Sequence, residues 1–155
     1  MQDFPHIYHV TATAEPLENL NLTSAGLPVI ASATPKEFGG PGDKWSPETL
    51  LIAAVADYFV LTFRAIASAS ASKLPWLTLT CAVAGHLDRQ DGVTQFTAFD
   101  IVVVLEVPQD TNEGRALRLL EKAEKNCLIT NSLLAPAKLQ ASITINHDAD
   151  SGQTS

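Results

Sequence analysis

The two cysteines are the side chains whose chemistry is easiest to identify in this sequence. Cys81 alternates with Leu79 and Val83 along one segment, and such a cysteine usually serves as a small apolar core side chain. Cys127 lies instead at a predicted helix boundary, where a thiol can be either reactive or structural. Both interpretations of Cys127 stay open. Two cysteines are too few for a disulfide scaffold, and their spacing is not that of metal ligands.

Three polar residues accompany the longest apolar segment and form a second candidate site. Asp57 and Tyr58 lie near its middle, and Glu48 lies ten residues before Tyr58. A carboxylate in an apolar helix is costly unless it has a partner, and Arg64 is seven residues away, too far for pairing within one helix. Asp57 therefore needs a partner elsewhere. The trio predicts either a ligand site or hydrogen bonding at a subunit interface.

Neither the histidines nor the glycines predict a bound group. His6 and His9 are three residues apart on a predicted strand, so their side chains point to opposite faces. Gly39, Gly40 and Gly42 are not followed by the lysine and hydroxyl of a phosphate-binding loop, and they indicate a tight turn before a helix. We expect no metal and no cofactor.

One long helix must position the polar trio. Ser46 can cap its free N–H groups, Pro47 suits the first helical position, and Glu48 suits the positive end of the helix dipole. The helix should run to about Ser72, with apolar side chains on every side. Because a small chain can hardly enclose such a helix alone, we expect a second subunit to cover it, which makes a homodimer.

Strand patterns surround this helix. Period-two alternation and turn residues predict three short strands before it, a hairpin after it, then an amphipathic helix, a short helical turn and a last strand. The order is β-β-β-α-β-β-α-β, which is an α+β fold with antiparallel sheets. The expected elements span 6–14, 19–23, 27–33, 76–87, 93–107, 113–126, 130–134 and 139–147. Residues 1–147 should form a single domain, followed by a flexible polar tail over 148–155.

Composition excludes several classes of function. The chain has 155 residues and a net charge of -7, so it should repel nucleic acids and anionic lipid surfaces. The first residues lack the basic start and apolar stretch of a secretory signal. Asp57 and Arg64 interrupt the longest apolar segment, which favours a buried helix over a membrane span. We expect a cytoplasmic protein.

Two motifs resemble the OsmC/Ohr family, the osmotically inducible protein C and organic hydroperoxide resistance proteins. The first covers residues 34–42 and 46–54, from Thr-Pro-Lys-Glu-Phe-Gly-Gly to Ser-Pro-Glu-Thr-Leu-Leu-Ile-Ala-Ala. The second is Ala-Glu-Lys-Asn-Cys-Leu-Ile-Thr-Asn-Ser-Leu at 123–133. The resemblance implies an OsmC-like intertwined homodimer, with antiparallel sheets packed on long central helices and two sites at the subunit interface.

The resemblance also implies a chemistry that this chain matches only in part. Family peroxidases reduce organic hydroperoxides with a reactive cysteine on the long helix, a second cysteine that closes a disulfide, and an arginine and a glutamate that activate the first thiol. Glu48 and Cys127 occupy two of these positions. The reactive cysteine is replaced by Tyr58, and the chain has no arginine before Arg64, although the family's arginine should lie around residues 18–19.

Three functions follow, in order of preference. The first is an OsmC-like protein without the two-cysteine peroxidase cycle that binds a small apolar or amphipathic ligand at the dimer interface. The second is a one-cysteine peroxidase that uses Cys127 with an external thiol in oxidative stress defence. The third is another enzyme built on Glu48, Asp57 and Tyr58, whose phenol could stabilise an oxyanion but supplies no thiolate.

Overall fold

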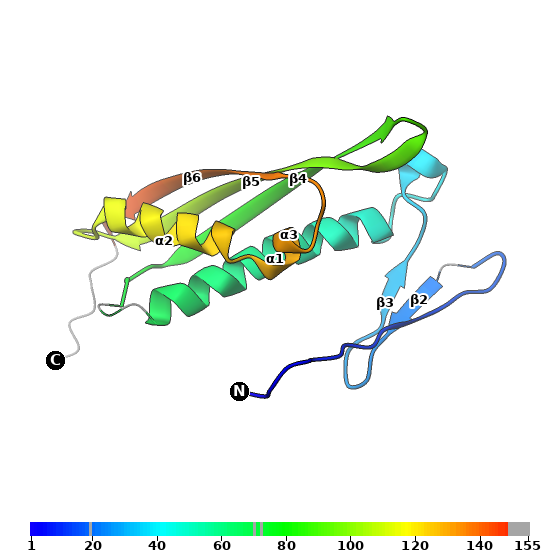
Figure 1. Ribbon diagram of the computed structural model, residues 1–155, viewed down its shortest axis with the longest axis horizontal. Helices are drawn as coiled ribbons and strands as arrows, with labels where there is room; N and C mark the ends of the chain where they lie inside the picture. The colour runs from blue at the N-terminus through cyan, green and yellow to red at the C-terminus, as the bar shows by residue number, and fades with distance from the viewer. Residues whose placement is uncertain (19, 70, 72, 149–155) are drawn as a thin grey trace. The chain divides into compact units, whose positions relative to one another are not determined.

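The computed structural model describes residues 1–18, 20–69, 71 and 73–148 (Figure 1). The chain divides into two compact units, Met1–Leu51 and Ile52–Ser155, and each is described by itself. The α+β class and the predicted order of strands and helices are confirmed. The single domain over 1–147 stays a prediction, and residues 149–155 of the expected tail lie outside the described part.

The first unit holds a small sheet of three short antiparallel strands. These are β1 (Thr11–Thr13), β2 (Leu20–Thr23) and β3 (Ile30–Ser32), in the order β1-β2-β3. β1 and β3 are shorter than the predicted ranges 6–14 and 27–33. The residues that precede each of these two strands are exposed and do not pair with a neighbouring strand. A single turn of 3-10 helix, η1 (Lys36–Phe38), follows.

The turn predicted from the glycines is confirmed. Gly39 has a φ of 85° and donates its N–H to the Lys36 carbonyl at 3.0 Å, which closes η1. Gly40 approaches the Thr34 carbonyl so closely that a Cβ atom would overlap it. The chain then leads to Ser46, whose Oγ accepts the Thr49 N–H at 3.2 Å while Thr49 Oγ1 accepts the Ser46 N–H at 2.9 Å. This reciprocal pair confirms Ser46 as the cap of the long helix α1 (Pro47–Ala69).

The second unit is built on a three-stranded sheet in the order β4-β5-β6. The strands are β4 (Thr78–Gln90), β5 (Val93–Pro108) and β6 (Ala137–Asn146). The turn between β4 and β5 is formed by Asp91 and Gly92 at φ 51° and 80°, the left-handed pair of a two-residue hairpin.

The expectation that all pairs are antiparallel is wrong for β6. β4 and β5 are antiparallel, whereas β6 runs parallel to β5 with Val103 opposite Ala141. The chain leaves β5 at one end and returns through α2 (Glu113–Lys125) and the one-turn helix α3 (Leu128–Asn131), so it re-enters the sheet in the same direction. Helical crossovers of this kind join parallel strands.

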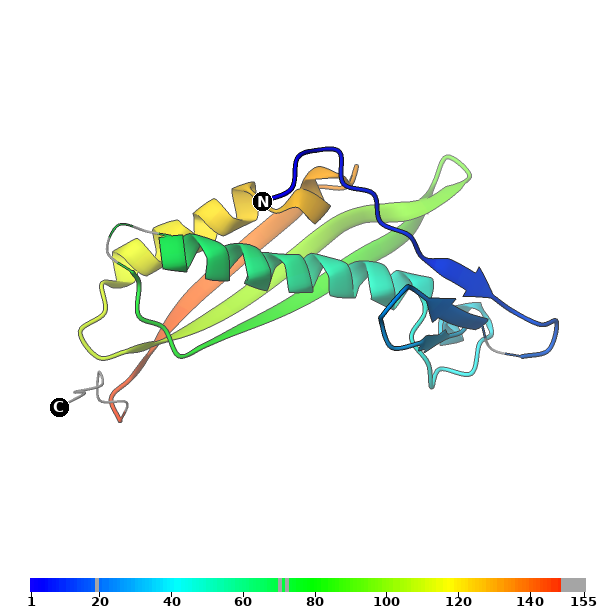
Figure 2. The same ribbon diagram turned by 90° about the horizontal axis from the view of Figure 1, so that it is seen from below.

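The helices of this unit lie on one face of its sheet, and the apolar core lies between them (Figures 1 and 2). α1 contributes a stripe of fully buried side chains at every fourth position: Val55, Phe59, Phe63 and Ala67. β5 faces it with Phe99, Ile101, Val103, Leu105 and Val107. Gly85 on β4 allows the close approach of Ile52, whose Cδ1 a Cβ atom would overlap. α2 adds Ala116, Leu120 and Ala123, whereas Leu117 on the same helix is only half-buried.

The remaining sides of α1 are covered far less. Leu61 is 45% exposed, Asp57 and Arg64 are exposed, and Tyr58 and Thr62 are half-buried. By length and mean hydropathy alone α1 could cross a membrane, a criterion that the core helix of a water-soluble protein also meets. The buried stripe shows that one side of α1 is the centre of a packed core.

Both cysteines lie in this second unit. Cys81 is half-buried on β4 and packs against the core between Leu79 and Val83, as the alternation predicted. Cys127 is 0% exposed and caps α3 between the end of α2 and Leu128. Burial raises the pKa of the Cys81 thiol to about 11, and the nearby Cys127 adds to the rise because two thiolates repel each other.

We predict that neither thiol reacts readily while the protein is folded. Raising the pKa of Cys81 from 9.0 to about 11 lowers its thiolate fraction about a hundredfold near neutral pH. Iodoacetamide labelling of Cys127→Ser, in which Cys81 is the single cysteine, should therefore slow on folding from urea, by less than that factor because this variant lacks the contribution of Cys127 to the raised pKa. In Cys81→Ser, burial should protect Cys127. Equal labelling of Cys127 in folded and unfolded protein would contradict this.

The raised pKa of Cys81 predicts that the free energy of unfolding falls as the pH rises above 9.0. The unfolded thiol ionises first as the pH rises, so the contribution of Cys81 is complete below pH 9.0 and is lost as the pH approaches about 11. Urea unfolding of wild type and Cys81→Ser across this range should show a steeper loss of stability for wild type.

Candidate functional site

A pocket of about 400 Å³ lies between α1 and the end of α2, entirely within the second unit. Its α1 wall consists of positions 58, 61, 62, 65 and 66, which follow the three- and four-residue spacing of one helix face. Leu61, Ala65 and Ile66 make this wall largely apolar. The volume falls in the range of small-molecule sites, which are typically apolar with a few polar groups.

Tyr58 is the sequence-predicted site residue that lines this pocket. Its side chain is half-buried, and its hydroxyl makes no hydrogen bond to any residue that the structure describes. Thr62, one turn further along α1, adds a second hydroxyl to the same wall. Because a phenol hydroxyl can donate and accept a hydrogen bond, Tyr58 offers an unused polar group beside an apolar surface.

The end of α2 supplies the remaining polar groups. Lys122 and Asn126 line the pocket, and Lys122 is exposed. Asn126 donates its Nδ2 to the Lys122 carbonyl at 2.7 Å and its backbone N–H to the same oxygen at 3.2 Å. The Lys122 ammonium forms no ion pair within the described ranges. The α2 wall therefore presents an uncompensated positive charge and one amide oxygen.

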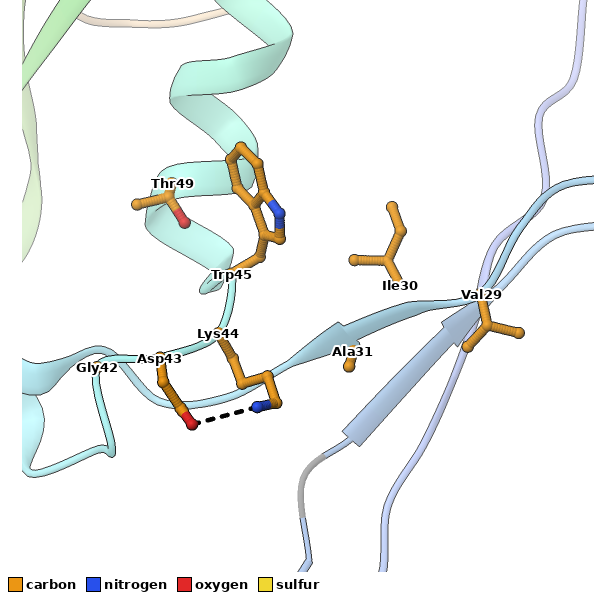
Figure 3. Close-up of a pocket in the computed structure, with 8 residues that line it drawn as sticks. All are labelled: Val29, Ile30, Ala31, Gly42, Asp43, Lys44, Trp45 and Thr49. Atoms are coloured by element: carbon orange, nitrogen blue, oxygen red, sulfur yellow. Dashed lines mark hydrogen bonds and ion pairs between the residues drawn. The ribbon is translucent and has the colours of Figure 1, made fainter.

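A larger pocket, of about 650 Å³, lies in the first unit and is lined by β3 and the chain that leads into α1 (Figure 3). Val29, Ile30 and Trp45 give it an apolar wall. Its lysine is neutralised, because Lys44 Nζ pairs with Asp43 Oδ2 at 3.2 Å. It contains no residue that the sequence singled out for chemistry, so the α1–α2 pocket is the better candidate despite its smaller volume.

The other predicted site residues do not line the α1–α2 pocket. Cys127 follows Asn126 directly but is sealed in the core, and Asp57 is exposed. Glu48 lies in the first turn of α1, in the first unit, and its Oε2 is shielded from solvent without a hydrogen-bond partner in the described part of the chain. A buried carboxylate oxygen in this state lacks the hydrogen bond that would offset the cost of its burial.

Sequence reasoning missed Lys122 and Asn126 as pocket residues. A signal existed on α1, because Tyr58, Thr62 and Ile66 repeat at four-residue intervals with mixed polarity. No signal identified the facing residues, because only the packing of α2 beside α1 brings them to Tyr58. In the described residues, no group of three or more His, Cys, Asp or Glu side chains lies together, so the structure identifies no metal-binding set.

Comparisons with known proteins agree with this architecture. YmaD of Bacillus subtilis, an uncharacterized protein, is 24% identical over 76% of this chain and 79% of its own length. An OsmC-like protein of unknown function from Vibrio cholerae has the same fold, with a TM-score of 0.76 and 16% identity over 90% of this chain and all of its own.

A solved organic hydroperoxide resistance protein also shares the fold. The protein from Elizabethkingia anophelis gives a TM-score of 0.70 at 19% identity, and the match covers 92% of this chain and 100% of that chain. The family described as OsmC-like protein matches residues 40–142, which include α1, the β4–β5 hairpin, α2 and α3. This match extends over well more than half of the sequence, and the chain belongs to the OsmC-like protein family.

Proposed function

We propose that this OsmC-like protein binds a small apolar or amphipathic molecule in the α1–α2 pocket and does not run a two-cysteine hydroperoxide cycle. One observation carries the proposal: Tyr58, which stands where the OsmC/Ohr resemblance places the reactive thiol, lines that pocket. A thiolate attacks a peroxide and becomes a sulfenic acid, whereas a phenol has no corresponding step. In this chain the position lines the pocket and lacks the nucleophile.

The pocket is suited to an amphipathic ligand. Leu61, Ala65 and Ile66 offer apolar contact, and the Tyr58 and Thr62 hydroxyls offer hydrogen bonds. A site with a large apolar wall and few polar groups binds through buried area and takes its specificity from the polar groups. The Tyr58 hydroxyl has no hydrogen-bond partner among the described residues. It lies at the position that the family resemblance assigns to the reactive cysteine.

The second candidate, a one-cysteine peroxidase that uses Cys127 with an external thiol, has less support. A peroxidatic thiol must ionise and must meet its substrate. Cys127 is 0% exposed and does not line the pocket. Its nearest candidate partner, Cys81, is held protonated by a pKa of about 11. If this candidate holds, the activity is of the oxidoreductase type, the reduction of organic hydroperoxides.

The third candidate, a different enzyme built on Glu48, Asp57 and Tyr58, has less support again. Of these residues only Tyr58 lines the pocket, and Asp57 is exposed. Without a nucleophile or a base beside it, the phenol binds or polarises a ligand and does not complete a reaction.

We also propose that the protein is a cytoplasmic homodimer in which a second subunit covers α1. The side of α1 away from the core carries a large apolar side chain, Leu61, which is 45% exposed in one copy. Glu48 Oε2, which has no hydrogen-bond partner among the described residues, supports this assembly, because a second subunit could supply a donor.

The purified protein should not consume organic hydroperoxide catalytically. With cumene hydroperoxide and a dithiol reductant, we expect consumption at the rate of the uncatalysed mixture, and Cys127→Ser should not change it. Catalytic turnover abolished by Cys127→Ser would overturn the proposal in favour of the one-cysteine peroxidase. Turnover lost in Tyr58→Phe but kept in Cys127→Ser would favour the third candidate.

Filling the pocket should abolish ligand binding. Ala65 is exposed and lines the pocket, so Ala65→Trp places an indole in the space that a ligand would occupy. Binding of 1-octanol, measured by calorimetry, should weaken by about tenfold or more in this variant. Ala69→Trp is the matched control, since Ala69 ends the same helix outside the pocket and is also exposed. Equal affinities in the two variants would place the binding elsewhere.

Light scattering should give twice the mass of one chain at micromolar concentration. Leu61→Glu, which places a charge on the exposed apolar side of α1, should shift the population toward one copy. Glu121→Gln on α2 serves as an exposed control. A wild-type mass equal to one chain would refute the homodimer.

A further inference from the structure

We infer that the ligand of the α1–α2 pocket carries a carboxylate head group, which the Lys122 ammonium binds. This inference rests on the proposed function, because it names the chemistry of a ligand for that same pocket. Among the described residues that line the α1–α2 pocket, Lys122 is charged and none is a carboxylate, which gives this lining a positive charge. The chain as a whole carries a net charge of -7, which makes a positive pocket a local exception.

Lys122 is free to bind an external anion. Each of the two ion pairs among the described residues, Lys44 with Asp43 and His86 with Asp100, lies away from it. The carbonyl of Lys122 is already occupied by the two N–H donors of Asn126, at 2.7 Å and 3.2 Å. The end of α2 therefore lines the pocket with a lysine that forms no ion pair among the described residues and whose carbonyl is already hydrogen-bonded. An anion there would gain a charge-assisted hydrogen bond.

The arrangement of polar and apolar walls gives the ligand an orientation. The apolar residues Leu61, Ala65 and Ile66 belong to α1, whereas Lys122 belongs to α2. A molecule with an aliphatic chain and a charged end would lay its chain on α1 and direct its charge toward α2. The Tyr58 hydroxyl, which has no partner in the described residues, can donate to the second oxygen of a carboxylate.

The charge of the site favours a monoanion over a phosphate. Phosphate sites usually combine several donors, such as arginine forks or the N–H groups at a helix N-terminus. The described lining has one lysine and no arginine, and it lies at the C-terminal end of α2, where the negative end of the helix dipole disfavours a dianion more than a monoanion. A single ammonium with one hydroxyl matches the charge and the two oxygens of a carboxylate.

The test compares two probes of equal chain length, octanoate and 1-octanol, by isothermal titration calorimetry. Wild type should bind octanoate about tenfold more tightly than 1-octanol. Lys122→Gln should remove this preference by weakening octanoate binding about tenfold, to the affinity of 1-octanol. Lys125→Gln, a matched change in the same last turn of α2 but outside the pocket, should keep the preference.

The outcomes separate this inference from the proposed function. If both probes bind equally in wild type, and Ala65→Trp blocks both, the pocket binds ligands but the carboxylate inference is overturned. If neither probe binds, both the proposed function and this inference are overturned. An octanoate preference that survives Lys122→Gln would also overturn the inference.

A salt titration covers the case in which Lys122→Gln does not fold. Rising salt should weaken octanoate binding to wild type and spare 1-octanol, and Lys122→Arg should keep the preference because it keeps the charge. Octanoate binding that is insensitive to salt would overturn the inference.

Discussion

The packing of one stripe of α1 against the central strand β5 positions the candidate site of the second unit. Phe59 and Phe63 are fully buried, and they set the rotation of the helix on the sheet. Adjacent helix positions differ by about 100°. Burying Phe59 therefore turns Tyr58 out of the core and toward α2, where the pocket forms. The core and the candidate site are two consequences of one helix orientation.

Much of this architecture could be predicted from the sequence, because its signals are local. The reciprocal cap at Ser46, the left-handed pair Asp91–Gly92 and the alternation around Cys81 each depend on neighbouring residues, and each is confirmed. The predicted direction of β6 is wrong, because the alternation of apolar and polar residues looks the same for a strand that runs in either direction. Only the path through α2 and α3 determines that direction.

The candidate site was predicted in part for the same reason. Tyr58 was identified from its place in the helix and from the family resemblance, and it lines the pocket. Lys122 and Asn126 were not identified as pocket residues, because they meet Tyr58 only through tertiary packing. The sequence allows both a reactive and a structural role for Cys127, because sequence patterns do not show how deeply a side chain is buried. Its complete burial now favours the structural role.

The placement of the two thiols makes this chain convenient for spectroscopy. Cys127 is sealed and Cys81 resists ionisation, so a cysteine introduced at an exposed turn such as Asp91–Gly92 would be the principal attachment point for a maleimide dye. Fluorophore or spin-label pairs on the hairpin tip and on the first unit would then report the distance between the two compact units in solution, with both native cysteines left in place.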